Sequence, residues 1–215
     1  MRAESPRSYV AFAAGTRIAA GDLRTVAVAA AAAAGGPHQP VMIFDDETGE
    51  IVELDLRGGP DEVVGRLPEG AVGEVELEVG TAPRGPGRPK LGVVSKEVTL
   101  LPRHWAWLGA QRGSVSATLR RLIDEARRLH EGRDAVRRSQ DAAYRFVSVM
   151  ASSEPSFEEA IRALYRGDAE RFHLESARWP PDVREQSRKL AAAAFRTMPA
   201  PSRPPDRGRP AAEHP

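Results

Sequence analysis

The stretch SKEVTLLPRHWAWLGAQRGSVSATLRRLIDEARR, residues 95–128, decides how this sequence is interpreted. Residues 95–100 form a short β-type segment, which predicts a strand. Pro102 suits the first turn of a helix over residues 102–111, because a proline there loses no hydrogen bond. Gly113 ends that helix. Over residues 114–132, apolar side chains at helical spacing predict a long amphipathic helix: Val115, Leu119, Leu122, Ile123, Ala126 and Leu129.

Charge is distributed unevenly along the 215 residues, although the formal net charge is only +1. Residues 1–80 carry a net charge of −8, residues 84–138 carry +8 and residues 139–215 carry +1. A segment as basic as the middle one indicates a negatively charged partner such as nucleic acid. The alternative is that the acidic and basic blocks attract each other within one fold.

The order of strand, short helix, Gly-Ser and longer helix in residues 95–128 resembles the ribbon-helix-helix family of DNA-binding proteins. The resemblance implies a homodimer in which two chains pair their strands into a ribbon that enters the major groove. Lys96 and Thr99 would then read the DNA. The start of the second helix would meet a backbone phosphate, with Ser114 and Ser116 beside its unpaired N–H groups. The alternative is an ordinary strand-helix-helix piece of a larger core.

Two short basic runs resemble AT-hooks, which lie in the minor groove of A·T-rich DNA. Gly87-Arg88-Pro89-Lys90 lies in a Gly/Pro-rich linker, residues 81–94, and Arg207-Gly208-Arg209-Pro210 lies near the C-terminus. Glycine allows close approach to the groove, and arginine follows its negative potential. The candidate DNA contacts are Arg84, Arg88 and Lys90 in the linker and Arg207 and Arg209 in the second run. The alternative is chance, because the chain is rich in Arg, Gly and Pro.

The rest of the chain predicts an α+β protein with further units on both sides of residues 95–132. Residues 1–80 form a small acidic α+β unit, with strands at 9–15, 16–22, 41–46 and 50–56, helices at 23–34 and 60–67, and an edge strand at 72–80. Residues 133–198 form a helical unit, with helices at 133–152, 156–167, 168–179 and 183–198. Residues 199–215 are Pro-rich, and we expect them to be disordered.

Several single residues carry local predictions. Asp22 and Asp168 are expected to cap the helices that follow them, and Gly167 to end a helix. Ser156 with Glu159 forms a capping-box pattern. The three tryptophans are interpreted as core anchors rather than as platforms for stacked bases: Trp105, Trp107 and Trp179.

Catalytic and metal-binding signals are weak in this sequence. The chain has no cysteine, so disulfides and thiolate chemistry are excluded. The carboxylates of FDDETGE, residues 44–50, suggest a divalent cation, but a soluble hairpin tip explains them better because the spacing of a calcium loop is missing. The five histidines are scattered, and no nucleotide-binding or hydrolase motif occurs. We therefore expect no enzyme, no metal and no cofactor.

The N-terminus shows no secretory signal, and the longest apolar run is too short for a bilayer, so a cytoplasmic protein without membrane contact is expected. FDDETGE, GRPKLGVVSKEVTLLPRHWAWL and WPPDVREQ together give the chain a resemblance to a bacterial family with a domain of unknown function. That resemblance implies no activity. The sequence favours a homodimeric DNA-binding protein, either a transcriptional regulator or a nucleoid-associated protein. The alternative is a protein-interaction module that does not bind nucleic acid.

Overall fold

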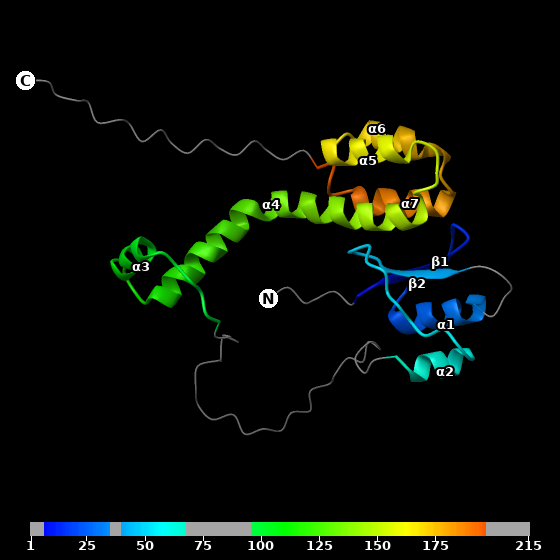
Figure 1. The fold of residues 1–215 in the computed structure, drawn as a ribbon, viewed down its shortest axis with the longest axis horizontal. Coiled ribbons are helices and arrows are strands. Elements are labelled where there is room, and N and C mark those ends of the chain that lie inside the picture. Colours follow the sequence, from blue (N-terminus) through cyan, green and yellow to red (C-terminus); the bar gives the residue numbers. More distant parts are fainter. Residues whose placement is uncertain (1–6, 35–39, 68–95, 197–215) are drawn as a thin grey trace, which may run out of the picture.

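The computed structural model describes residues 7–34, 40–67 and 96–196, and it confirms the α+β class (Figure 1). The predicted linker, the strand at 72–80 and the C-terminal tail lie outside the described residues. Among the described residues, no helix has the length and apolar character to cross a membrane. The elements are β1 (Tyr9–Ala13), β2 (Thr16–Gly21), α1 (Leu23–Ala34), β3 (Val41–Asp45), α2 (Pro60–Gly65), α3 (Pro102–Gly109), α4 (Val115–Met150), α5 (Phe157–Arg166), α6 (Ala169–Glu175), the 3-10 turn η1 (Ser176–Arg178) and α7 (Pro181–Ala191).

The three strands form one antiparallel sheet in the order β2-β1-β3. The predicted hairpin of β1 and β2 is confirmed, and its two-residue loop is Ala14-Gly15. Both loop residues have positive φ, 49° and 79°, which matches the twist of a tight hairpin. Because side chains alternate along a strand, β1 directs Val10 and Phe12 to one face and Ala11 to the other.

Helices cover both faces of the sheet (Figure 1). On one face, Val26 and Ala30 of α1 pack with Ala11 and Ile43 of the sheet. The predicted cap of α1 is confirmed, since the Thr25 N–H donates to Asp22 Oδ1 at 2.9 Å. Hydrogen bonds from Thr25 lower the pKa of Asp22 below its ordinary value. The helix α2 packs on the outer side of α1 through Val63.

On the other face, the C-terminal half of α4 packs on the sheet together with α7. Phe146 of α4 lies against Phe12 and Phe44, with ring centroids 5.3 Å and 4.9 Å away. The Ser139 hydroxyl in α4 donates to the carbonyl oxygen of Leu190 at 2.5 Å and accepts from the N–H of Ala194 at 3.0 Å. The N-terminal strands and the C-terminal helices, predicted as separate units, thus share one hydrophobic core.

The pair α5 and α6 lies over α4 and α7 and completes this side of the molecule (Figure 1). The prediction that Trp179 anchors the core is confirmed, since its side chain is buried and its Nε1–H donates to the Pro155 carbonyl at 3.0 Å. Asp168 caps α6 as predicted, accepting from the Arg171 N–H. Gly167 ends α5 in the left-handed region at φ 72°.

The predicted strand over residues 50–56 is wrong as a backbone assignment. Only Ile51 pairs with β3, through a single bridge to Phe44. The sequence EIVELDL alternates apolar Val52, Leu54 and Leu56 with other residues, and this pattern did identify the inward side chains, because these three pack on the α1 side of the sheet. Alternating burial therefore came from side-chain packing, without the ladder of hydrogen bonds that defines a strand.

Two helix predictions also require correction. The helices expected at 114–132 and 133–152 are a single helix, α4, which continues through Gly132 without a break. A lone glycine lowers helix stability by only about 1 kcal/mol, which is too little to end a long amphipathic helix. The capping box at Ser156 does not form: Ser156 has φ 62°, and its side chain makes no cap hydrogen bond.

The turn after β3 packs directly against α4, and this contact gives a stability prediction. Gly49 has φ 65°, and a Cβ there would lie 2.2 Å from the carbonyl oxygen of Ala142. Gly49→Ala should therefore lower the free energy of unfolding by about 2–5 kcal/mol, through left-handed strain and overpacking. The measurement is chemical denaturation followed by tryptophan fluorescence.

The matched control is Gly65→Ala in α2, where a Cβ would meet nothing within 4 Å. Alanine is the better helix former, so this variant should be neutral or stabilised by up to about 1 kcal/mol. Equal effects of the two substitutions would contradict the packing of Gly49 on α4.

Candidate nucleic-acid interface

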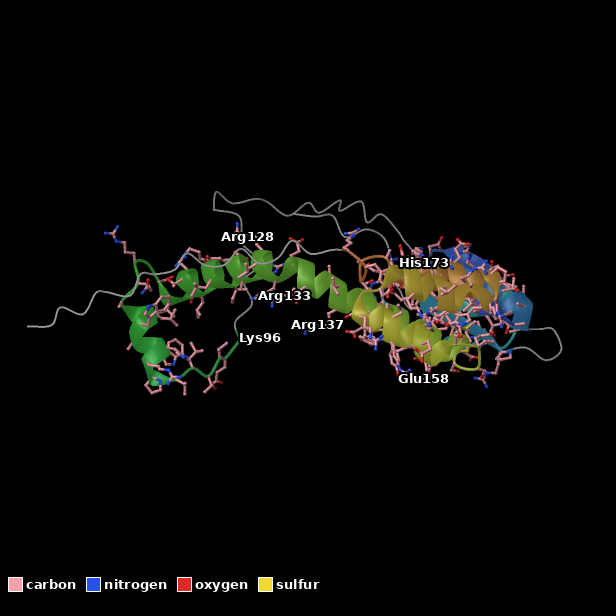
Figure 2. The ribbon with its side chains drawn as sticks, turned by 90° about the horizontal axis from the view of Figure 1, so that it is seen from above. Lys96, Arg128, Arg133, Arg137, Glu158 and His173 are labelled. Carbon is pink, nitrogen blue, oxygen red and sulfur yellow. The ribbon has the colours of Figure 1, made fainter. Side chains whose placement is uncertain are left out.

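Residues 96–138 form an arm that leaves the rest of the molecule, which we call the body. The arm comprises residues 96–101, α3 and the N-terminal two-thirds of α4, and it extends away from the sheet and from α5–α7 (Figures 1 and 2). At about 1.5 Å per residue, the 36 residues of α4 span roughly 54 Å. In the arm only Leu108 and Thr118 are buried. The arm therefore has almost no core of its own among the described residues.

The strand predicted at 95–100 is not present in the structure. Residues 96–100 form no helix or strand, and Ser95 lies outside the described residues. A strand is stabilised by backbone hydrogen bonds to a neighbour. The strands β1–β3 form a sheet of their own that does not include this segment. The ribbon-helix-helix arrangement is thus not confirmed. Lys96 and Thr99, the predicted DNA-reading residues, are both exposed.

The second predicted DNA-binding feature, the N-terminus of the long helix, has the expected local structure. Ser114 is the N-cap of α4, and its hydroxyl accepts from the Ala117 N–H at 3.2 Å. By helix geometry the N–H groups of Val115 and Ser116 have no intrahelical acceptor. Ser116 is exposed in the first turn. This end of α4 can therefore offer two N–H groups and a hydroxyl to an anion.

Positive charge surrounds the arm on more than one side. The arm carries ten Lys/Arg and five Asp/Glu residues, a net charge of +5. Arg128 lies on the opposite side of α4 from Arg133 and Arg137 (Figure 2). The ion pairs Arg121–Glu125 and Arg137–Asp134, at 3.9 Å and 3.7 Å, involve exposed side chains. Exposed pairs contribute about 0–1 kcal/mol, so these arginines can exchange their carboxylates for phosphates at small cost.

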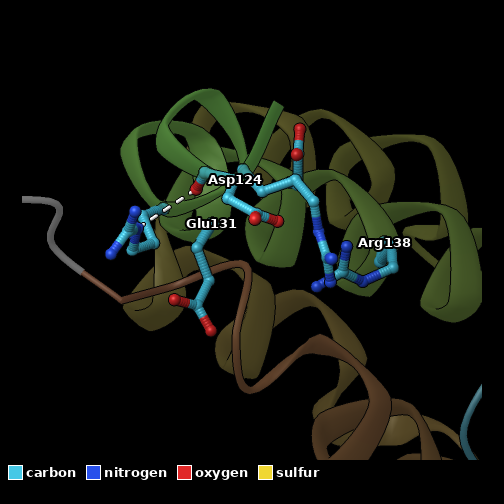
Figure 3. Close-up of a pocket in the computed structure, with 6 residues that line it drawn as sticks. Asp124, Glu131 and Arg138 are labelled. Carbon is cyan, nitrogen blue, oxygen red and sulfur yellow. Dashed lines mark hydrogen bonds between the residues drawn. The ribbon is translucent and has the colours of Figure 1, made fainter. Parts of the chain in front are cut away.

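A hollow of about 590 Å³ lies along α4, and the described residues that line it are all charged (Figure 3). Among these described residues, three arginines and three carboxylates line the hollow, so their charges balance. The residues are Asp124, Arg127, Arg128, Glu131, Asp134 and Arg138. An anion would meet as many negative as positive groups there. The hollow therefore does not form a phosphate site by itself, and the cationic character of the arm comes from its whole surface.

The carboxylates after β3 serve the turn and the body. Asp45 Oδ1 accepts from the N–H groups of Glu47 and Thr48, at 2.9 Å and 2.8 Å. Asp46 accepts from the side chains of Gln186 and Lys189 in α7. These contacts support the interpretation of FDDETGE as a structural turn. Within the described ranges, no group of three or more His, Asp or Glu residues is arranged to hold a metal ion.

Two tryptophans contradict the sequence prediction. Trp105 and Trp107 were expected in the core, but their side chains in α3 are 45% and 51% exposed. Among the described residues, the short helix α3 packs mainly on α4, so it does not bury side chains on all its faces. Val98, Leu101, Ile123 and Leu129 of the arm are also exposed. Sequence reasoning missed this exposed apolar surface, because helical periodicity identifies an apolar face without showing what covers it.

The remaining predicted DNA contacts belong to two other parts of the chain. Arg84, Arg88 and Lys90 precede the arm in the chain, and Arg207 and Arg209 lie near the C-terminus. All five are outside the described residues. The described part of the predicted interface thus consists of Lys96, Thr99, Ser114 and Ser116, which all belong to the arm.

Residues 8–191 match the model of a family described as uncharacterised proteins conserved in bacteria (DUF2239). The chain belongs to this family. The match begins just before β1 and ends with α7, so it includes the body and the arm together. No curated protein and no solved structure matches the chain. The family resemblance seen in the sequence is confirmed, and the family description names no activity.

Ser114 and Ser116 are expected to have different roles, since Ser114 caps α4 and Ser116 does not. Ser114→Ala should lower the free energy of unfolding by about 1 kcal/mol, because it removes the acceptor of the Ala117 N–H. Ser116→Ala removes no cap and should leave stability within about 0.5 kcal/mol of the parent. Thermal denaturation followed by circular dichroism measures both. A larger loss for Ser116→Ala than for Ser114→Ala would contradict the cap.

Proposed function

We propose that this protein binds DNA as a dimer through the arm, and acts as a transcriptional regulator or nucleoid-associated protein in the cytoplasm. The observation that carries the proposal is the basic face of α4. With 100° between successive residues of a helix, four arginines lie opposite the apolar stripe that contains Leu119, Leu122 and Ala126. They are Arg120, Arg121, Arg127 and Arg128, and all four are exposed.

The shape of the arm supports contact with a duplex. A single α-helix fits the major groove of B-DNA, and the body stands away from the arginine-bearing part of α4 (Figure 2). Arginine suits phosphate because its planar guanidinium donates two parallel hydrogen bonds. The arm therefore extends far enough from the body to contact a duplex, is positively charged, and carries arginine, the side chain that suits phosphate. These contacts would position the chain on DNA without selecting a sequence.

The predicted basic runs extend the same proposal. Arg84, Arg88 and Lys90 precede the arm in the sequence. They would contact DNA phosphates or the minor groove next to the site where the arm binds. Arg207 and Arg209 would add a second such contact. In a dimer, residues 96–100 of two copies could pair as a ribbon, with Lys96 and Thr99 toward the bases. Neither this ribbon nor the AT-hook-like contacts are needed for binding by the arginines of α4.

A protein-interaction module is the second candidate. The exposed side chains of Trp105 and Trp107 favour it, because aromatic residues are enriched at protein interfaces. The two candidates differ in their dependence on salt. DNA binding weakens steeply as salt rises, since each neutralised phosphate releases condensed counterions. Burial of apolar surface is not weakened in this way.

The basic face is tested by replacing its arginines with glutamine, which removes the charge and has a similar helix propensity. The variant combines Arg120→Gln, Arg121→Gln, Arg127→Gln and Arg128→Gln. If each arginine neutralises one phosphate, the slope of log affinity against log salt should fall by up to about 4. The measurement is fluorescence anisotropy of a labelled duplex over a salt series.

The control carries Arg162→Gln and Arg178→Gln, two exposed arginines of the body. This control should bind DNA as the parent does. Lack of binding by the parent at low salt would overturn the DNA proposal. Equal slopes for the parent and the four-residue variant would remove α4 from the interface.

Two further substitutions test the other predicted contacts. Ser116→Glu places a carboxylate in the first turn of α4, which favours the helix by roughly 0.3–1 kcal/mol but would repel a phosphate. It should leave the protein folded and lower affinity for every DNA sequence alike. Arg88→Ala with Lys90→Ala should reduce the salt slope by up to about 2. Unchanged DNA binding by these variants would exclude the corresponding contact, and the same anisotropy assay measures it.

A further inference from the structure

The helix α4 carries one apolar stripe through two different environments. Successive residues of the stripe are four and three positions apart in turn, which is the spacing of a coiled-coil seam. In the arm the stripe consists of Val115, Leu119, Leu122, Ala126 and Leu129. After Arg133 it continues with Val136, Ala143 and Val147, and the last two are fully buried in the core of the body.

The two halves of the stripe differ in what covers them. The sheet, α5–α7 and the half of α4 within the body form one core. In the arm, α3 is the neighbouring helix, and it leaves Leu129 71% exposed and Ile123 56% exposed. Exposed side chains of this size on a helix with little core of its own indicate an interaction surface.

We propose that this surface is covered by a second copy of the same chain, whose α4 packs antiparallel across the first. The seam consists of Leu119, Leu122, Ala126 and Leu129 of each arm, with Ile123 beside them. A second copy of the chain suits this surface, because the positions that flank the stripe carry little charge that would be repelled by an identical partner. These positions are Ser116, Thr118, Ile123, Glu125, His130 and Gly132. Only Glu125 among them bears a full charge, and it already pairs with Arg121 of its own chain.

The sizes of the stripe residues fit an antiparallel pair with its two-fold axis near Asp124. In this register Leu119 faces the partner's Leu129, and Leu122 faces the partner's Ala126. The two central layers thus each pair a large side chain with a small one, which allows the helices to pack closely at the axis. Ile123 lies beside the partner's Ile123 at the axis. The same patch serves both chains, which is the property of a two-fold interface.

A parallel pair fits the structure less well. In a parallel coiled coil each residue faces its own copy, so the next position of the stripe would bring two Arg133 side chains together. The two bodies, each built around α4 from Ser139 onward, would also meet at the same end (Figure 1). The antiparallel arrangement places the bodies at opposite ends and leaves the overlapping arms between them.

This inference rests on the apolar stripe and not on the proposed function. Residues at the outer positions of the seam region are almost all charged: Arg120, Arg121, Asp124, Arg127, Arg128 and Glu131. The dimer would therefore bury the stripe and keep the basic face in solvent. Dimerisation and DNA binding depend on different residues, so each can fail without the other.

The first test is light scattering of the full chain and of a variant with Ile123→Glu and Leu129→Glu. We expect a dimer for the parent and a monomer for the variant, because burial of four carboxylates in one seam is unfavourable. Leu174→Glu, at a 63% exposed leucine of the body, is the control and should remain dimeric. Circular dichroism and Trp179 fluorescence verify that the body stays folded.

The second test uses the absence of cysteine to determine the direction of the pair. Ile123→Cys should be joined to its copy by a short thiol-to-thiol cross-linker, because this position lies at the axis. His130→Cys, seven residues away on the same side of the seam, should not, since the two copies would lie on the order of 20 Å apart. A parallel pair would cross-link at both positions.

Three results would overturn the proposal. A parent that is strictly monomeric at high concentration would show that the stripe is covered by another segment of its own chain or by a different protein. A dimer that persists in the Ile123→Glu, Leu129→Glu variant would place the interface elsewhere. Equal cross-linking at positions 123 and 130 would exclude the antiparallel register. The four-arginine variant should remain a dimer while DNA binding weakens, which separates this proposal from the proposed function.

Discussion

The contact of Phe146 with Phe12 and Phe44 determines how the two parts of this protein are related. The three rings belong to α4, β1 and β3, and their centroids lie 4.9–6.3 Å apart. By fixing one half of α4 on the sheet, they fix the direction in which the other half leaves the body. Because α4 is a continuous helix, its rigidity carries that direction to the end of the arm.

A helix anchored at one end can present two faces to other molecules at its free end. In the arm of α4 the apolar stripe and the arginine face lie on opposite sides of the helix axis. An apolar face gains free energy by contact with a partner, whereas an arginine face remains hydrated until it meets an anion. The proposed dimer and the proposed DNA contact therefore reinforce each other geometrically, since pairing of the stripes turns the arginines outward.

Much of the fold followed from local signals in the sequence. The β1–β2 hairpin, the caps at Asp22 and Asp168, and the end of α5 at Gly167 each depend on residues that are close together in the chain. The predictions that failed depend on distant neighbours. Ser156 has the residue type of a cap, but its backbone lies in the left-handed region. Residues 50–56 alternate as a strand does, yet only Ile51 pairs with β3.

The sequence by itself determined the helical faces, the charge of the arm and the α+β class, because periodicity and composition act over a few residues. Only the tertiary structure decided which apolar faces are covered. Trp179 and Trp107 are the same residue type in amphipathic surroundings, but the first is buried and the second is half exposed. Burial depends on segments brought together from distant parts of the chain, and no local pattern encodes which of them will meet. The predicted contacts Lys96, Thr99, Ser114 and Ser116 all lie in the arm, whereas the arginine face of α4 was not predicted as part of the site, because the sequence does not show that the body leaves that face open.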